Sequence, residues 1–234
     1  MAKAPPVAEQ ELTAQQWFER GFNATNPDEE IRFYTEAIRL QPEYPWSYFN
    51  RALTRHANGD PAGAVLDYSE AIRLRPNDAD AYMNRGAARI DQGDIEGALR
   101  DYNEAMRLTP HDAEVFNNRG LVFHDRGDLM AAVRDYDEAV RLKPDYTEVL
   151  HNRGLALYDL GELERALRDF NEAIRVKPND ADAYCNRGLV LWDRGDPEAA
   201  VRDFDQAIRL QPDHAFALSN RELVLKAIAA RSKS

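Results

Sequence analysis

The sequence is poor in cysteine, in long apolar runs and in basic charge. Cys185 is the only cysteine, so the chain cannot form an internal disulfide. It contains no run of about 18 apolar residues, which excludes a membrane-spanning helix, and residues 1–16 lack the apolar centre of a signal peptide. The net charge of -11 argues against a nucleic-acid partner, which usually needs a basic surface. We therefore expect a cytoplasmic protein without a membrane span.

The residue sets needed for catalysis are also missing. The sequence has no glycine-rich loop of the phosphate-binding kind, and Cys185 has no evident basic residue to activate its thiol. His124 and His151 are a candidate metal pair with Asp125 nearby, but zinc needs more ligands. We expect no enzyme activity, no cofactor and no metal site.

What the sequence does contain is an internal repeat. Proline recurs six times at one fixed spacing, at Pro42, Pro76, Pro110, Pro144, Pro178 and Pro212. A fixed period of this length indicates one supersecondary unit stacked on copies of itself, sharing one continuous core. The full-length repeats are 45–78, 79–112, 113–146, 147–180 and 181–214. We therefore predict an all-α solenoid, a single array over residues 14–231.

Each repeat is predicted to form two helices joined by a glycine. Helix A follows the proline and ends where a left-handed residue is easiest to accommodate, at Gly59, Gly93, Gly127, Gly161 and Gly195. Helix B begins at the next residue. Small polar residues before helix A are expected to cap its first turn; they include Asp78, Asp112, Asp145 and Asp180.

The two ends of the chain depart from the repeat. Residues 1–13 are predicted to be a disordered lead-in, although Thr13 and Gln16 have the spacing of a capping box. The first repeat, 14–44, is irregular. Residues 215–231 repeat helix A alone and predict a capping helix, followed by a tail at 232–234.

The recurring residues resemble the tetratricopeptide repeat (TPR) family, in the form with Asn-Arg-Gly at positions 6 to 8. The match is large or aromatic at position 4, small at 8, alanine at 20 and 27, aromatic at 24 and proline at 32. The resemblance implies a right-handed superhelix of antiparallel helix pairs whose A helices line a concave groove for partner peptides. It also implies an adaptor without catalytic activity. Phe18 and Phe22 stand where the family's carboxylate clamp needs lysine and asparagine, so that clamp is absent.

Position 7, usually leucine in the family, is arginine in every repeat of this chain. An arginine at a packing position needs an acidic partner because an unpaired buried charge is costly. Helix B of the same repeat supplies an aspartate at a constant spacing. We therefore expect a structural Arg–Asp ladder, which includes Arg85 with Asp101, Arg119 with Asp135, and Arg153 with Asp169.

Position 6 is asparagine six times, at Asn50, Asn84, Asn118, Asn152, Asn186 and Asn220. In the family, an asparagine here can bond to the backbone of an extended peptide, since an amide offers a donor and an acceptor. The alternative is that each asparagine bonds its own or a neighbouring helix.

Acidic residues are predicted to edge the groove around an apolar floor. Position 13 supplies Asp91, Asp125, Asp159 and Asp193, and position 2 supplies Asp80, Glu114, Glu148 and Asp182. The floor includes Trp46, Phe49, His124, His151, Tyr158 and Trp192. Together these residues favour a basic, extended peptide as partner. The alternative is that the acids only keep the surface soluble or favour helix N-termini.

Two functions remain open from the sequence. The first is a scaffold or adaptor that binds an extended, basic peptide. The second is a structural protein that self-associates as a dimer or end-to-end stack, for which Phe18, Phe22, Phe33 and Trp46 supply apolar surface in the irregular first repeat. RNA binding by a helical-repeat protein is a third, disfavoured by the acidic charge.

Overall fold

The computed structural model describes residues 12–231, which fold into thirteen α-helices and no strand. The chain divides into two compact units, Met1–His111 and Asp112–Ser234. The first holds α1 (Ala14–Asn23), α2 (Pro27–Leu40), α3 (Pro45–Ala57), α4 (Pro61–Leu74), α5 (Ala79–Asp91) and α6 (Ile95–Leu108). The second holds α7 (Ala113–Asp125), α8 (Leu129–Leu142), α9 (Thr147–Asp159), α10 (Leu163–Val176), α11 (Ala181–Asp193), α12 (Pro197–Leu210) and α13 (Ala215–Arg231).

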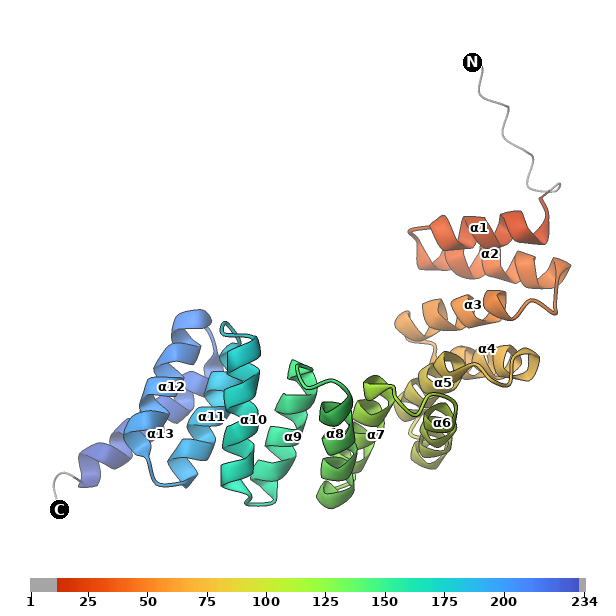
Figure 1. The fold of residues 1–234 in the computed structure, drawn as a ribbon. Helices are drawn as coiled ribbons and strands as arrows, with labels where there is room; N and C mark the ends of the chain where they lie inside the picture. The colour runs from red at the N-terminus through yellow and green to blue at the C-terminus, as the bar shows by residue number, and fades with distance from the viewer. Residues whose placement is uncertain (1–11, 232–234) are drawn as a thin grey trace. The chain divides into compact units, whose positions relative to one another are not determined.

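Each unit is a stack of antiparallel helix pairs (Figure 1). Odd-numbered helices are the A helices of the repeat and even-numbered ones are the B helices. The predicted all-α solenoid of helical repeats is confirmed. The lead-in expected at 1–13 falls outside the described residues up to residue 11, as does the tail at 232–234. No described helix has the length and apolarity needed to cross a membrane.

Glycine turns join the two helices of each full repeat. Gly93, between α5 and α6, adopts φ +79°, a left-handed conformation that costs a glycine little. The same conformation recurs at Gly59, Gly127, Gly161 and Gly195. The predicted ends of the A helices are therefore confirmed.

Helix starts follow the predicted caps with one exception. Asp78, Asp112 and Asp180 each accept a backbone N–H of the first turn, and Thr13 forms the expected capping box with Gln16. The cap expected at Asp145 is wrong, because Tyr146 occupies the N-cap of α9 and gives no side-chain hydrogen bond. Glu162 lies at the N-cap of α10 but also makes no such bond.

The core of each pair is an aromatic ring of helix B packed on a small residue of helix A. A Cβ added to Gly120 would lie 2.6 Å from Cε1 of Tyr136, so only glycine allows this approach. The same contact joins Gly154 to Phe170 and Gly188 to Phe204. Tyr136, Phe170 and Phe204 are fully buried, which fixes the two helices of each repeat as one body.

Candidate functional site

The A helices α9 and α11 and the turns before them line an open cleft of about 510 Å³. Every residue that lines it has a polar or charged side chain. Four carboxylates contribute, from Asp145, Glu148, Asp180 and Asp182, together with Lys143, Lys177, Tyr146, Thr147, His151 and Asn152. The cleft therefore brings together two residues predicted for the peptide groove, His151 and Asn152, with two of the predicted position-2 acids.

His151 is a half-buried ionisable group of this cleft. Its Nε2 lies 2.7 Å from the side-chain nitrogen of Asn186, and its ring meets Phe170 edge-on at a centroid distance of 5.6 Å. An amide nitrogen only donates, so the ring nitrogen accepts and the imidazole is neutral. Burial acts in the same direction, because it lowers the pKa of His151 below its ordinary value.

The asparagines at position 6 divide into two groups. Asn152 donates to Oδ1 of Asn117 at 3.0 Å, and Asn186 bonds to His151, in each case 35 residues back in the chain. Three others donate instead to a carbonyl of their own helix four residues back: Asn50 to Trp46, Asn84 to Asp80 and Asn220 to Phe216. Asn118 lies half-buried on α7.

The residue at position 5 of the preceding repeat explains this division. Asn117 and His151 are polar and offer an acceptor, so the next asparagine turns toward them. Where the preceding residue is Phe18, Phe49 or Cys185, which are poor acceptors, the asparagine stays on its own helix. Five of the six asparagines therefore bond to their own helix or to a neighbouring one, as in the alternative to peptide binding.

The acids at position 13 make contacts that the sequence did not reveal. Asp91 lies 2.7 Å from Nε2 of His56, Asp159 lies 3.4 Å from Nε2 of His124, and Asp193 accepts from the hydroxyl of Tyr158 at 2.5 Å. Each bond joins adjacent A helices of one unit. The carboxylates of Asp91 and Asp159 remain 60% and 50% exposed, so they still present negative charge to the solvent. Asp125 is exposed on α7.

Tyr158 shows how strongly one of these contacts acts. Burial and the carboxylate of Asp193 raise the pKa of its hydroxyl to about 12. The phenol is therefore protonated at neutral pH and remains a donor to Asp193.

The two histidines considered for a metal have separate partners. His124 bonds to Asp159 and His151 to Asn186. Across residues 12–231, no group of three or more His, Cys, Asp or Glu side chains is placed to hold a metal ion.

The aromatic residues predicted for the groove floor are only partly available. Trp46 is 39% exposed, with the guanidinium of Arg75 over its ring at 4.4 Å. Phe49 packs edge-on against Tyr68, and Trp192 packs against the buried cluster of α11, α12 and α13.

The apolar surface predicted for the first repeat is smaller than expected. Phe33 is buried beside Trp17, and Phe18 packs against the rings of Tyr34 and Tyr44. Of the four residues predicted, Phe22, at 70% exposure, and Trp46 are open. The prediction is wrong for Phe33, because that ring is buried against Trp17 of α1. Phe18 is half-buried, because Tyr34 of α2 and Tyr44 of the following turn pack on its ring.

Arginine at position 7 pairs with an aspartate of helix B in five successive repeats. In each pair Nε and one terminal nitrogen bond the two carboxylate oxygens, the geometry that favours arginine over lysine. The pairs are Arg51–Asp67, Arg85–Asp101, Arg119–Asp135, Arg153–Asp169 and Arg187–Asp203, at 2.6 to 2.9 Å. All five aspartates are buried.

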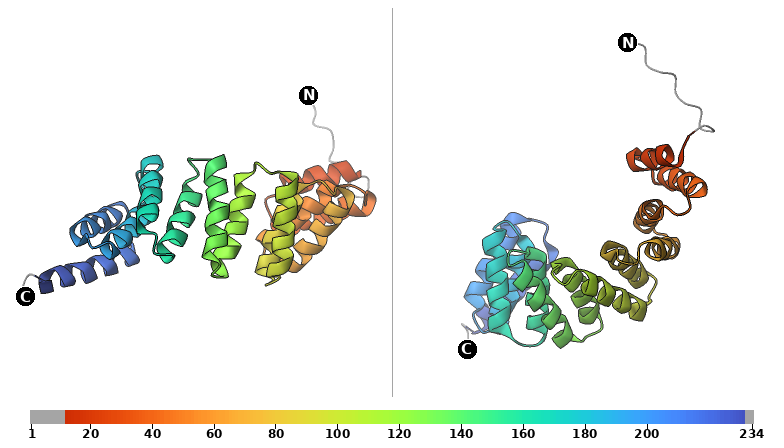
Figure 2. Two further views of the ribbon diagram at one scale, coloured as in Figure 1. Left: turned by 60° about the horizontal axis from the view of Figure 1, so that its bottom comes forward. Right: turned by 45° about the vertical axis from the view of Figure 1, so that its right-hand side comes forward.

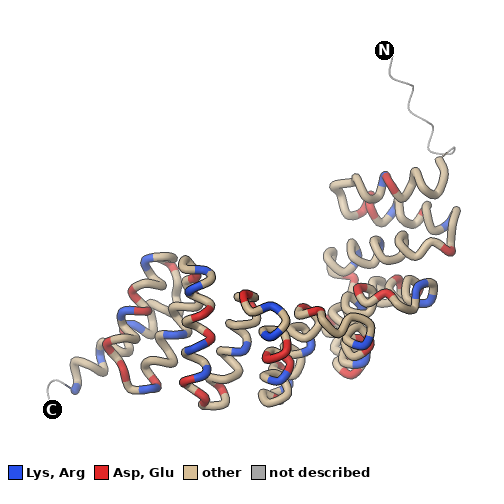
Figure 3. The backbone as a smooth tube through the Cα atoms, viewed as in Figure 1, with Lys and Arg blue, Asp and Glu red and all other residues tan. Residues whose placement is uncertain are grey.

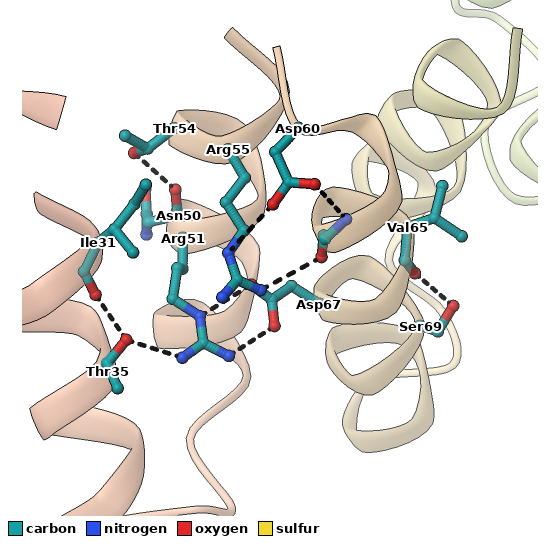
Figure 4. A network of polar contacts seen from close by, with 11 residues as sticks. Ile31, Thr35, Asn50, Arg51, Thr54, Arg55, Asp60, Val65, Asp67 and Ser69 are labelled. Carbon is teal, nitrogen blue, oxygen red and sulfur yellow. Dashed lines mark hydrogen bonds and ion pairs between the residues drawn. The ribbon is translucent and has the colours of Figure 1, made fainter. Parts of the chain in front are cut away.

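Four of these arginines also reach the B helix of the preceding repeat. Figure 4 shows Arg51 held by Asp67 on α4 and by the hydroxyl of Thr35 on α2. Arg153 reaches Asp137 on α8 and Arg187 reaches Asn171 on α10 in the same way. Each of these arginines therefore ties three helices together within its unit.

Unit 1 adds a second arginine that sequence analysis missed. Arg55, at position 11, donates to Asp67 at 2.8 Å (Figure 4). Arg89, at the same position of the next repeat, donates to Asp101 at 2.8 Å. In unit 2 the same position holds Phe123, Leu157 and Leu191. The buried aspartates thus have two arginine partners in unit 1, while Asp169 and Asp203 pair with one arginine each in the ion pairs of unit 2.

Family models of the repeat match most of the chain. One described as "TPR repeat" matches residues 55–90, 88–127, 120–161 and 154–195. Two described as "Tetratricopeptide repeat" match residues 33–65 and 181–214. The chain belongs to the tetratricopeptide repeat family. TPR arrays are protein-interaction scaffolds, and the stacked helix pairs of this TPR chain agree with that membership.

Solved structures of TPR proteins resemble this TPR chain over most of its length. YrrB, described as a TPR protein with an unusual peptide-binding site, is 27% identical with a TM-score of 0.67, covering 81% of this chain and 97% of YrrB. PilF of Pseudomonas aeruginosa has a TM-score of 0.75 at 19% identity, covering 89% and 96%. MamA of Desulfovibrio magneticus RS-1 has a TM-score of 0.67 at 19% identity, covering 73% and 96%. No curated protein matches the chain.

Proposed function

We propose that this interaction scaffold binds an extended peptide bearing basic side chains on the face formed by its A helices, without catalysis and without a cofactor. The family supports the scaffold, and the similarity to YrrB, whose description names a peptide-binding site, supports a peptide as the partner.

The observation that carries the proposal is the cleft at His151. Its four carboxylates outnumber its two lysines, and both lysines are engaged: Lys177 pairs with Asp180 at 3.2 Å, and Lys143 lies over the ring of Tyr146 at 4.5 Å. The neutral ring of His151 adds no positive charge. A lysine or arginine side chain entering the cleft would therefore meet net negative charge.

Side-chain amides supply a means of holding the peptide backbone. Asn220, in the same unit as the cleft, uses one N–H on its own helix, which leaves its amide oxygen and its second N–H for a ligand. Such contacts read the backbone rather than the sequence, so charge is the expected source of selectivity.

The wider surface fits modest selectivity for charge. Figure 3 shows acidic and basic residues interspersed along the helices of both units. On the B helices the arginines are already paired three residues apart, as in Arg141–Glu138 at 2.5 Å and Arg175–Glu172 at 2.5 Å. These exposed pairs present balanced charge, whereas the cleft does not.

The test compares two fluorescent pools of random peptides, each about ten residues long and able to extend over roughly 33 Å. One pool carries only lysine and arginine as charged residues, and the other only aspartate and glutamate. Fluorescence anisotropy should show tighter binding of the basic pool. The double change Glu148→Gln with Asp182→Asn should weaken that binding about two- to thirtyfold, because each of the two lost ion pairs contributes roughly 0.2–1 kcal/mol.

A matched control removes the same charge elsewhere. Glu138→Gln with Glu172→Gln also raises the net charge by two but acts on α8 and α10, outside the cleft. Affinity for the basic pool should change little in that variant. Equal weakening by both variants would mean that only the total charge attracts the peptide, and tighter binding of the acidic pool would contradict the proposal.

A further inference from the structure

Among the residues that the structure describes, α13 is the last helix of unit 2, and it occupies the place of an A helix with no B helix packed on its outer side. It follows α12, and the left view of Figure 2 shows it at the end of the stack. The exposed fractions of leucines at equivalent repeat positions show how much less of α13 is covered than of α9. Leu150 and Leu157 on α9 are 2% and 1% exposed, whereas Leu218 and Leu225 on α13 are 45% and 37% exposed.

Arg221 on α13 is also less buried than the equivalent arginines of the preceding repeats. It keeps the bond to the preceding B helix, through Asp205 on α12. Within the described part of the chain, however, no buried aspartate pairs with it as one does with Arg187. Its side chain is 40% exposed, against 22% for Arg187 and 17% for Arg153.

These residues border a cleft of about 540 Å³ between α12 and α13. The lining consists of Asp205, Ile208, Leu218, Ser219, Arg221, Glu222 and Leu225. It combines two leucines with an adjacent arginine and glutamate. A helix that covers it must offer apolar side chains and charges of both signs.

An ordinary B helix does not fit this surface. Position 8 of α13 is Glu222, where five other A helices have glycine. At Gly188, even a Cβ would lie 2.8 Å from the ring of Phe204. A helix carrying an aromatic residue in that place would collide with Glu222, so the occupant has another pattern.

The pattern that fits is that of α13 itself. Its exposed side has Leu218 three residues before Arg221, and Leu225 three residues after Glu222. When two such helices lie antiparallel about a two-fold axis at the Arg221–Glu222 step, each leucine faces the other leucine. Each arginine then faces the partner's glutamate, which makes the surface complementary to itself in both shape and charge.

We propose that α13 docks against α13 of a second copy of this chain, forming an antiparallel two-fold dimer. The leucines supply apolar burial at its centre, and the two reciprocal Arg221–Glu222 ion pairs fix its register. Glu222 gives up an exposed pairing with Lys226 on its own helix, a contact of little energetic weight. This interaction is separate from peptide binding on the A-helix face, so either can fail without the other.

The test is sedimentation velocity of the full chain between about 1 µM and about 1 mM, the range of weak to moderate affinity. The wild type should shift from monomer to dimer as concentration rises. In a homodimer, Arg221→Glu places four glutamates at the axis, two from each chain, and Glu222→Arg places four arginines there. Each variant alone should raise the dimer dissociation constant at least about tenfold, because like charges then oppose each other twice.

Mixing the two variants makes the test specific. In the mixture, both glutamates of one chain face both arginines of the other, so a heterodimer should form although neither variant dimerises alone. Circular dichroism establishes that each variant is folded. If Arg221→Glu disturbs the contact with Asp205, the variant Leu218→Gln with Leu225→Gln replaces it, and this change should also abolish the dimer.

Two results would overturn the proposal. A wild type that stays monomeric over the whole range has no such interface. A dimer that survives the charge variants and the leucine variant uses a different surface.

Discussion

The side-chain amide of Asn152 donates to Oδ1 of Asn117 at 3.0 Å, across two A helices and 35 residues of sequence. Asn117 is only 1% exposed and also donates toward Glu148 at 3.4 Å. Asn84 has the same place in its repeat but bonds only its own helix. One residue type at one repeat position therefore has two roles, set by the preceding repeat.

Asn152→Ala should destabilise unit 2 by about 1–2 kcal/mol, because it leaves the buried amide oxygen of Asn117 without its donor. Asn84→Ala is the matched control and should cost much less, since its amide only bonds an exposed carbonyl of its own helix. Urea denaturation of the two variants measures the difference. Equal costs would mean that the bond between helices adds nothing to stability.

Arg153→Leu should cost about 3 kcal/mol, because it strands the buried carboxylate of Asp169. Arg85→Leu should cost less, since Arg89 still donates to Asp101 at 2.8 Å. Urea denaturation combined with hydrogen exchange in each unit would compare them. A larger loss at Arg85 would contradict the supporting role of the second arginine.

Stability should depend on pH through His151. Burial lowers its pKa below the ordinary value of 6.5, so the unfolded chain binds a proton more readily than the folded chain. The resulting stabilisation is full above pH 6.5 and is lost progressively as pH falls toward the lowered pKa. Asn117 occupies the equivalent position of the preceding repeat, so asparagine is compatible with this site. The variant His151→Asn therefore removes the titratable imidazole.

The free energy of unfolding of the wild type, measured relative to that variant, should therefore decrease between about pH 7.5 and about pH 5. An unchanged difference over this window would show that His151 titrates alike in both states. An increase toward acid pH would show that its folded pKa is raised.

Cys185 should react slowly with thiol reagents. It is 1% exposed, and burial raises the pKa of its thiol to about 11 from an ordinary value of 9.0. The difference, 11 − 9 = 2, corresponds to about 100-fold less reactive thiolate at neutral pH.

The thiol also packs in one cluster with Ala217 and Val224 of α13. Val224→Ala should loosen α13 and speed labelling, which a chromogenic disulfide reagent would follow directly. Ser69→Ala, in unit 1, is a control that should leave the rate unchanged. Rapid labelling of the wild type would contradict the packing of α13 over this cysteine.

The helix pairs and the Arg–Asp pairing were predictable because both lie within one repeat. The period predicts two helices and a glycine turn in each repeat. It also shows an arginine on helix A and an aspartate on helix B at a constant spacing, as in Arg153 and Asp169. Arg55 and Arg89 were overlooked although a signal existed, since position 11 changes from arginine to apolar residues after Arg89.

Contacts between repeats were less accessible from sequence. A period states how far apart copies are, but not which position of one A helix lies beside which position of the next. The observed offset is 35 residues, one more than the period, as in Tyr158 with Asp193. Because the sequence does not reveal this offset, it gives no sign that Asp193 bonds to Tyr158. The acceptance of a peptide by the cleft at His151 stays a prediction.

The bonds between adjacent A helices also bear on how repeats can be gained and lost. If recombination removed 147–180, Asn186 would face Asn117 and Asp193 would face His124. Both combinations already exist in the chain, as Asn152 with Asn117 and Asp159 with His124.

Arg187 would meet Asp137 in the same way, the partner that Arg153 uses now. Unit 2 could thus lose a whole repeat in one genetic event and find a polar partner for each of these side chains. These three polar contacts would need no compensating substitution at that junction.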